Sequence, residues 1–343
     1  MSHQNTEEIN RQAGNLEVQR QPKTFERIND GVYALKREVD PDVTLVFFHG
    51  LSQRGTNPEQ AFWRTWKRRD HEDCWPESLL PELLKKEGRG YKASVLSVSY
   101  ENRPDPGKDG KGTQASDEYL IVENLVNDLI LNEDADVGQK GVPVILVGHD
   151  LGGILVKSFV LMVERKAHSE SEEKVTRKLK NFLENLSSVF FYSTPHHGAK
   201  AFEQLAAKLK KSDANQMLRL MTILHKETAR INEDFGTYRR GEQGLKKFTT
   251  YGIHAACATL EGELSIQIVA EASARNDIDD FYSGRADHFG ICQEQAAITW
   301  ILSNGGSSKR YESVDYQMTI QTSRLSFRKI KAERFLLFPR ASK

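Results

Sequence analysis

Asp150 lies in the run Gly148-His149-Asp150-Leu151-Gly152, at the position where a G-x-S-x-G motif carries a nucleophilic serine. In such a motif, small residues allow a sharp turn between a strand and a helix, and the central side chain projects at the positive end of the helix. An apolar run, Val142 to Val147, precedes the turn, and a segment of helical period, Gly152 to Arg165, follows it. The sequence therefore predicts a strand, a tight turn and a helix, with aspartate in place of serine.

A carboxylate at position 150 limits the chemistry that this turn can perform. Attack by a carboxylate on an acyl carbon gives a mixed anhydride, so ordinary serine-type ester hydrolysis is not expected of Asp150. A carboxylate can attack a saturated electrophilic carbon, as in an epoxide or a haloalkane, and histidine-activated water can then hydrolyse the aspartyl ester. Epoxide opening also needs acidic hydroxyls, and the candidate lid segment offers only Tyr238. Alternatively, Asp150 forms an ion pair with a histidine that stabilises a pocket without turnover.

His288 is the candidate base that would work with Asp150. It follows Asp287 in a polar loop and precedes a predicted helix from Gln293 to Leu302. The chain order nucleophile, acid, histidine places the acid after the predicted strand Phe248 to Ala258. Glu261 is the nearest candidate for that acid, and the alternatives are Glu263, Glu271, Asp277, Asp279 and Asp280.

Two backbone amides complete the predicted site. His49-Gly50-Leu51 ends an early strand, Val43 to Phe48, and suits a loop that lends a backbone N–H to an oxyanion hole. The N–H groups of Leu51 and Leu151 would then converge on developing negative charge. The adjacent pair His196-His197 has no further His, Cys or Asp cluster at ligand spacing, so we expect no metal and no cofactor.

The elements that must position these residues alternate between strands and helices. Further strands are predicted at Ala93 to Tyr100, Val189 to Ser193 and Leu264 to Ala270, and further helices at Glu77 to Glu87, Tyr119 to Leu131 and Asn215 to Ile231. Such alternation indicates an α/β fold with a mostly parallel central sheet and helices on both faces. Residues 199 to 247 hold helical turns and no clear strand, and are predicted to form a small lid or insertion.

Several stretches in the same order resemble the α/β-hydrolase superfamily, in particular the lipase-like branch of the serine-active-site-containing proteins and, more remotely, the GPI inositol deacylases. They are VFFHGL (46–51), CWPESLLPELL (74–84), VLSVSYE (95–101), VILVGHDLGGILVK (144–157), VFFYSTPHHGAK (189–200) and ADHFGICQ (286–293). The resemblance spans residues 43 to 303 and implies an α/β-hydrolase fold with the roles given above for Asp150, His288, Leu51 and Leu151. In the family, the acid lies closer to the strand end, where this chain has Ala258.

Composition and the chain ends set the broader expectations. Lys+Arg and Asp+Glu both total 48, so net charge gives no reason to expect specific nucleic-acid binding. Three widely spaced cysteines indicate a reducing, cytoplasmic compartment, and no apolar run is long enough to cross a membrane. We expect a disordered arm over 1–24, a hydrolase domain over 25–303, and a linker and basic tail over 304–343. That tail mixes bases with Leu, Ile and Phe, which suits contact with an anionic membrane surface or a protein partner.

Two functions remain open at this point. In the first, the chain is a hydrolase that takes a small ester, lipid, epoxide or haloalkane, with Asp150, His288 and Glu261 in the site. In the second, the domain is catalytically degenerate and acts as a sensing or protein-interaction module that binds an apolar or ester-like ligand or a protein. The resemblance permits the second as well, because similar domains occur as N-terminal modules of nucleotide-binding immune-type receptors.

Overall fold

The computed structural model describes residues 24–51, 57–68, 73–87, 90–100, 118–208, 216–241, 246–261 and 264–293, with short strands at 312–313, 316–317 and 319–321. The predicted arm, apart from Thr24, lies outside the described residues. So do the predicted helix beyond Gln293 and most of the predicted tail.

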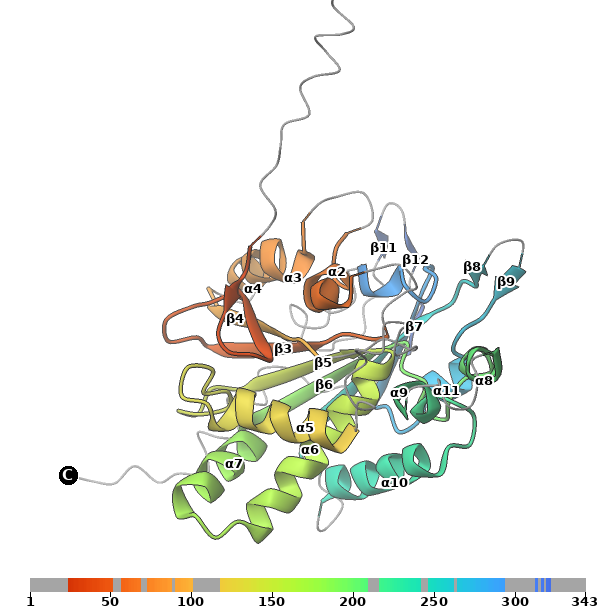
Figure 1. Ribbon diagram of the computed structural model, residues 1–343. Helices are drawn as coiled ribbons and strands as arrows, with labels where there is room; N and C mark the ends of the chain where they lie inside the picture. Colours follow the sequence, from red (N-terminus) through yellow and green to blue (C-terminus); the bar gives the residue numbers. More distant parts are fainter. Residues whose placement is uncertain are drawn as a thin grey trace, which may run out of the picture.

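A central sheet of nine strands, in the order β1-β2-β4-β3-β5-β6-β7-β10-β13, organises the described part of the chain (Figure 1). The neighbours from β4 through β3, β5, β6 and β7 to β10 pair in parallel, whereas β2 and β13 run antiparallel to β4 and β10. The strands are β1 (Glu26–Arg27), β2 (Val32–Lys36), β3 (Val43–Phe48), β4 (Ala93–Val98), β5 (Val144–His149), β6 (Leu186–Tyr192), β7 (Thr249–Ala255), β10 (Asp280–Gly284) and β13 (Thr319–Gln321). This is an α/β fold with a mostly parallel sheet, as the sequence predicts.

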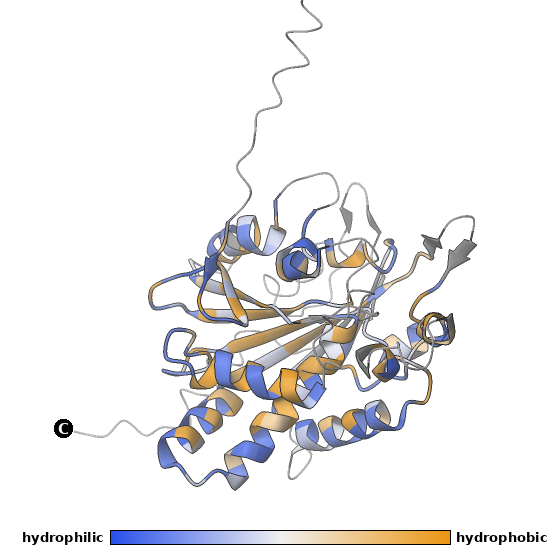
Figure 2. Cartoon of the chain, in the orientation of Figure 1, coloured by the Kyte–Doolittle hydropathy of each residue, from blue (hydrophilic) through white to orange (hydrophobic). Residues whose placement is uncertain are grey.

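The inner strands are buried along their whole length because helices cover both faces of the sheet. Every residue of β3, β4 and β5 is buried, which explains why they are continuous apolar runs and not alternating ones. One face is covered by α5 (Glu118–Val126), a π-helical turn (Asn127–Leu131), α6 (Leu151–Ser169), α7 (Glu173–Asn185) and α10 (Lys226–Arg240). The other carries α2 (Ala61–Arg64), α3 (Trp75–Ser78) and α4 (Leu80–Glu87). Figure 2 shows the apolar colours gathered on the strands and on the helix faces toward them.

Some elements differ from the sequence-based expectation. The helix α7 and the strands β2 and β10 are not among the predicted elements. The segment Leu264–Ala270 adds no strand to the central sheet, because β9 (Leu264–Ile266) pairs with β8 (Thr259–Glu261) in a separate two-stranded sheet. The last parallel strand is therefore β10, and α11 (Glu271–Ala274) lies between the hairpin and this strand.

The predicted lid divides into two parts. Its second half is α10, which buries Ile231 and Phe235 in the main core beside α6. Its first half, α8 (Lys200–Lys208) and α9 (Gln216–Leu220), lies at the end of the sheet near the hairpin (Figure 1). Only α8 and α9 therefore remain as a lid candidate.

The predicted domain boundary at residue 303 stays a prediction, and short strands lie beyond it. Within the predicted tail, β13 pairs with β10 and adds an edge strand to the central sheet. A second short pair, β11 (Glu312–Ser313) with β12 (Tyr316–Gln317), precedes it.

Candidate active site

Asp150 lies at a sharp turn between β5 and α6. Its backbone has φ 53° and ψ −121°, a combination that costs energy for a residue with a side chain. The turn is held by the Asp150 N–H, which donates to the Tyr192 carbonyl at the end of β6, at 2.9 Å. The side chain consequently projects from the carboxyl end of the parallel sheet, where α/β proteins build their sites.

Close backbone packing makes this geometry available. A Cβ on Gly152 would lie 2.3 Å from the Phe48 carbonyl oxygen, so α6 can approach the end of β3 only with glycine there. A Cβ on Gly50 would lie 2.7 Å from the Cβ of Asp150. The loop after β3 and the turn after β5 are thus in direct contact.

His288, on the loop that follows β10, faces the Asp150 carboxylate. Its Nε2 lies 3.3 Å from Oδ1 of Asp150, and each side chain is only 3% exposed. The two residues that the sequence pairs across 138 positions therefore lie together in the fold, in a buried side-chain contact.

The predicted oxyanion hole is occupied by Asp150 itself. The Leu51 N–H donates to Oδ2 of Asp150 at 3.3 Å, and the Leu151 N–H also hydrogen-bonds to this carboxylate. The two predicted donors therefore converge on the Asp150 carboxylate. They contact a carboxylate of the protein that already carries the negative charge.

Burial raises the pKa of Asp150, but several neighbours outweigh it. The hydrogen bond and charge of His288, the charge of His149 and the Leu151 N–H together hold the pKa of the Asp150 carboxyl below its ordinary value. The carboxylate is therefore ionised at neutral pH.

Four side chains around the dyad were not singled out from the sequence. The Nε2 of His149 lies 3.0 Å from the His288 carbonyl oxygen, and the His288 N–H donates to Oγ1 of Thr259 at 3.2 Å. The Tyr100 ring stacks on His49 at 4.0 Å and its hydroxyl donates to the His49 carbonyl, while Phe202 of α8 packs its ring edge against His288. His149 and Tyr100 stand inside the quoted motifs, whereas nothing in the sequence marks Thr259 or Phe202.

No carboxylate reaches the second ring nitrogen of His288 in the part of the chain that the structure describes. Its Nδ1 is buried and has no hydrogen-bond partner there. Glu261 ends β8, but its side chain, like Glu263, lies outside the described residues. The residues that directly follow β7, where the family's acid lies, are Ala256, Cys257 and Ala258.

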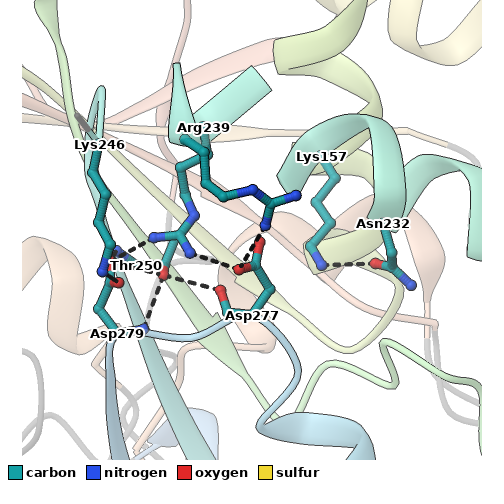
Figure 3. A network of polar contacts seen from close by, with 8 residues as sticks. Lys157, Asn232, Arg239, Lys246, Thr250, Asp277 and Asp279 are labelled. Carbon is teal, nitrogen blue, oxygen red and sulfur yellow. Dashed lines mark hydrogen bonds and ion pairs between the residues drawn. The ribbon is translucent and has the colours of Figure 1, made fainter. Parts of the chain in front are cut away.

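The remaining acid candidates lie away from the His288 ring, and three of them pair with arginines. Glu271 pairs with Arg275 at 2.7 Å on the exposed side of α11. Asp277 and Asp279 both bind Arg239 at 2.7 Å, as Figure 3 shows. Asp280 begins β10 at the end of the strand opposite the His288 loop. None of the four lies against the imidazole of His288.

Tyr238, the predicted epoxide-opening hydroxyl, is also displaced from the site. It packs against Phe248 and Lys247, and burial, with Glu164 adding to the effect, raises its pKa to about 12. Glu164 lies thirteen residues along α6 from Leu151, roughly 20 Å at 1.5 Å per residue. Tyr238 therefore belongs to the far end of α6, away from Asp150.

The described residues show neither a metal-binding cluster nor a membrane-spanning helix. Over the described ranges, no three His, Cys, Asp or Glu side chains gather in a way that would hold a metal ion. His196, one of the adjacent histidines, is fully buried with its ring against Phe191. No helix in the described part of the chain is both long and apolar enough to span a bilayer.

The strand order, the turn after β5 and the histidine after the last parallel strand together are those of an α/β-hydrolase fold. No family model matches the chain. The chain resembles Protein SERAC1 of Danio rerio, with 25% identity over 315 residues that cover 80% of this chain and 40% of that protein. It also resembles Protein SERAC1 of Homo sapiens, with 24% identity over 200 residues, 52% of this chain and 26% of the relative. It thus spans less than half the length of these curated relatives.

Solved structures with similar folds are lipases, esterases and related hydrolases. Bacillus licheniformis lipase BlEst2 in its propeptide form is 17% identical, with a TM-score of 0.43, over 82% of this chain and 55% of that chain. The type II thioesterase BorB from the borrelidin biosynthetic cluster is 14% identical, with a TM-score of 0.40, over 82% and 97%.

Proposed function

We propose that this lipase-like α/β-hydrolase domain does not turn over esters and acts by binding, as a sensing or interaction module. The observation that carries the proposal is the position of the Asp150 carboxylate. Its Oδ2 accepts the Leu51 N–H, the Leu151 N–H also bonds to the carboxylate, and its Oδ1 faces His288 at 3.3 Å. A serine hydrolase keeps those donors free for the oxyanion of the substrate.

The charge of Asp150 opposes acyl transfer in two ways. A substrate carbonyl that entered the hole would have to displace a carboxylate from two hydrogen bonds and from its contact with His288. The oxyanion that then develops would meet a second negative charge nearby, which destabilises the transition state. The Asp150 carboxylate consequently occupies the two N–H donors that an oxyanion would need.

A second candidate activity is hydrolysis through an aspartyl ester. It is favoured because Oδ1 of Asp150 faces His288 while Oδ2 accepts a backbone N–H. In this reaction Oδ1 of Asp150 bonds to a saturated carbon, and a halide leaves or the epoxide C–O bond breaks. His288 then takes a proton from water as the water oxygen adds to Cγ. The Leu51 and Leu151 N–H groups stabilise the negative charge that develops on the Asp150 carboxyl. The Cγ–O bond to the alkyl group then breaks as His288 returns the proton to the leaving oxygen, which releases an alcohol, and the Asp150 carboxyl loses its remaining proton to solvent.

The surroundings of the dyad favour the binding proposal over the aspartyl ester. The direct 3.3 Å contact leaves no space for a water between His288 and Asp150. The Tyr100 hydroxyl already donates to the His49 carbonyl, and burial, with Asp150 adding to the effect, raises its pKa well above the ordinary value. It is therefore a poor acid for a leaving oxygen.

Heavy-oxygen labelling separates the two proposals. A single turnover of wild type with an epoxide or a haloalkane in H₂¹⁸O puts ¹⁸O into the Asp150 carboxylate only if an aspartyl ester forms and is hydrolysed. We expect no label in the Asp150 peptide by mass spectrometry and no consumption of p-nitrophenyl butyrate. Labelled Asp150, absent from Asp150→Asn, would reject the binding proposal in favour of the aspartyl ester.

Restoring serine tests whether Asp150 is what blocks acyl transfer. Asp150→Ser frees both N–H donors and supplies a hydroxyl beside His288, so p-nitrophenyl butyrate hydrolysis should rise about 10²-fold or more above wild type. The double variant Asp150→Ser, His288→Ala is the control and should lose this gain. Esterase activity in wild type equal to that of Asp150→Ser would contradict the proposal.

A further inference from the structure

The position of His288 is maintained by its backbone. Its N–H donates to Thr259 Oγ1 at 3.2 Å, and its carbonyl oxygen lies 3.0 Å from Nε2 of His149. His149 is the residue before Asp150 at the end of β5, and Thr259 begins β8 beyond the end of β7. Two separate strands therefore hold the same residue, one through its N–H and one through its carbonyl.

The ring nitrogen of His149 that faces His288 must be the donor, because a carbonyl oxygen can only accept. Burial, together with the charge of His288, lowers the pKa of His149 to about 4, although Asp150 and the hydrogen bond to the His288 carbonyl oppose the shift. At neutral pH the imidazole is thus uncharged, with its one proton on Nε2. The Nδ1 of His149 has no hydrogen-bond partner among the described residues, so the single N–H of this ring is the one that donates to the His288 carbonyl.

Aromatic rings complete the surroundings of the His288 imidazole. The ring centroid of His149 lies 5.1 Å away, that of Phe289 lies 5.2 Å away at 83°, and that of Phe202 lies 6.2 Å away at 67°. With Asp150 at Nε2, these contacts restrict the orientation of the ring, while its Nδ1 has no described partner.

We propose that His149 and Thr259 are positioning residues that hold His288 through its backbone, a task that a triad acid performs through the ring. In a Ser-His-Asp triad, a carboxylate at Nδ1 sets the orientation of the histidine. Here the loop that carries His288 is tied to the residue beside Asp150, so the two members of the dyad are held in register by one side chain. The two hydrogen bonds hold His288 in this position whether or not Asp150 reacts.

Chemical modification of His288 tests the proposal in the full-length protein. Diethyl pyrocarbonate acylates imidazole nitrogens, and the rate at a buried histidine follows the population in which the site is open. His149→Leu and Thr259→Val each remove one hydrogen bond, so modification of His288, followed by peptide mass spectrometry, should accelerate about 2- to 10-fold. His149→Gln, whose amide can donate in place of Nε2–H, and Thr259→Ser should restore the wild-type rate.

Two controls distinguish positioning from general loosening. His254→Leu removes a matched contact, since Nε2 of buried His254 lies 3.1 Å from the Val269 carbonyl oxygen, and should leave the His288 rate unchanged. His196, fully buried elsewhere in the domain, reports on global opening within each sample. The proposal is wrong if His196 and His288 accelerate together. It is also wrong if His149→Leu has no effect while Glu261→Gln or Glu263→Gln exposes His288, because a carboxylate would then do the positioning.

Discussion

Asp150 carries, in the resting protein, the negative charge that a serine hydrolase develops only as its substrate reacts. The Leu51 and Leu151 N–H groups and His288 surround it, and together they lower the pKa of its carboxyl despite burial. The N–H donors of the predicted oxyanion hole therefore bind a carboxylate of the protein itself. The same atoms that would favour a transition state now favour the ground state of the protein.

Lys157, like Asp150, is an ionisable residue whose burial disfavours its charged form. It is 1% exposed in the middle of α6, and its Nζ donates to Oδ1 of Asn232 at 2.7 Å (Figure 3). The rings of Phe191 and Phe235 lie 5.2 and 5.3 Å from the ammonium nitrogen. Burial lowers the pKa of Lys157 to about 7, with Asp277 opposing the shift.

This shift predicts how stability depends on pH. Between about pH 7 and the ordinary lysine value of 10.5, the unfolded chain binds a proton at Lys157 that the folded chain lacks, so stability rises with pH. From pH 7.5 to 9.5, the free energy of unfolding of wild type should increase relative to that of Lys157→Met, by up to about 1.4 kcal/mol per pH unit. Urea denaturation measures the difference. Lys166→Met, on the same helix but partly exposed, should follow wild type; parallel curves for wild type and Lys157→Met would refute the prediction.

At the scale of elements, α10 is tied to the sheet by a buried cation. Arg239 is 4% exposed and binds Asp277 and Asp279, each at 2.7 Å, on the segment that leads into β10 (Figure 3). Asp279 also accepts the Thr250 N–H at 2.9 Å, which extends the network to β7. Two turns earlier on α10, Asn232 bonds Lys157 of α6 and the His196 carbonyl. The helix is thereby fixed to three neighbours, so it belongs to the core and not to a lid.

Removing the Arg239 guanidinium should therefore destabilise the fold strongly. Arg239→Met removes the buried cation that Asp277 and Asp279 share and leaves them only the more exposed Lys246 and Arg240, which is expected to cost about 3–5 kcal/mol. The next residue offers a matched control, because Arg240 is 56% exposed and its closest approach to Asp277 is 3.7 Å. Arg240→Met should cost less than about 1 kcal/mol. Similar urea midpoints for the two variants would show that α10 does not depend on the buried network.

Across the whole molecule, the described core contains several histidines that burial keeps neutral. Burial is the first cause of the lowered pKa of His149, His196 and His254. His196 is an extreme case, because it is fully buried and neither ring nitrogen has a partner among the described residues. Each of these groups must take up a proton when the chain unfolds in mild acid.

Acid should consequently weaken the domain before its carboxylates titrate. Below about pH 6.5 the unfolded chain binds protons that the folded chain does not, so stability falls as pH decreases toward the His149 pKa of about 4. Urea midpoints should drop steadily from pH 6.5 to 4.5, and His196→Phe should make this drop shallower. His168→Asn, at a side chain that is 72% exposed, should leave the slope unchanged. A midpoint independent of pH over this window would refute the prediction.

Local patterns predicted much of the fold because they act over a few residues. Val43–Phe48 and the run into His149 are apolar on both faces, so their burial in a parallel sheet follows from sequence. Helix α7 was missed because only a narrow stripe, including Leu179 and Phe182, is buried in an otherwise charged segment. β10 was missed because its residues, Asp-Phe-Tyr-Ser-Gly, become a strand through pairing with β7.

The same distinction between local pattern and tertiary contact applies to the candidate site. By itself the sequence determined that a strand, a turn and a helix present Asp150, and that Leu51, Leu151 and His288 are its expected partners, because glycines and apolar runs act locally. Only the tertiary structure decided that the Asp150 carboxylate fills the oxyanion hole, that His149 and Thr259 hold His288, and that Asp277 and Asp279 serve Arg239. These contacts join residues 29 to 139 positions apart, and such distances close only when the sheet brings the carboxyl ends of its strands to one edge.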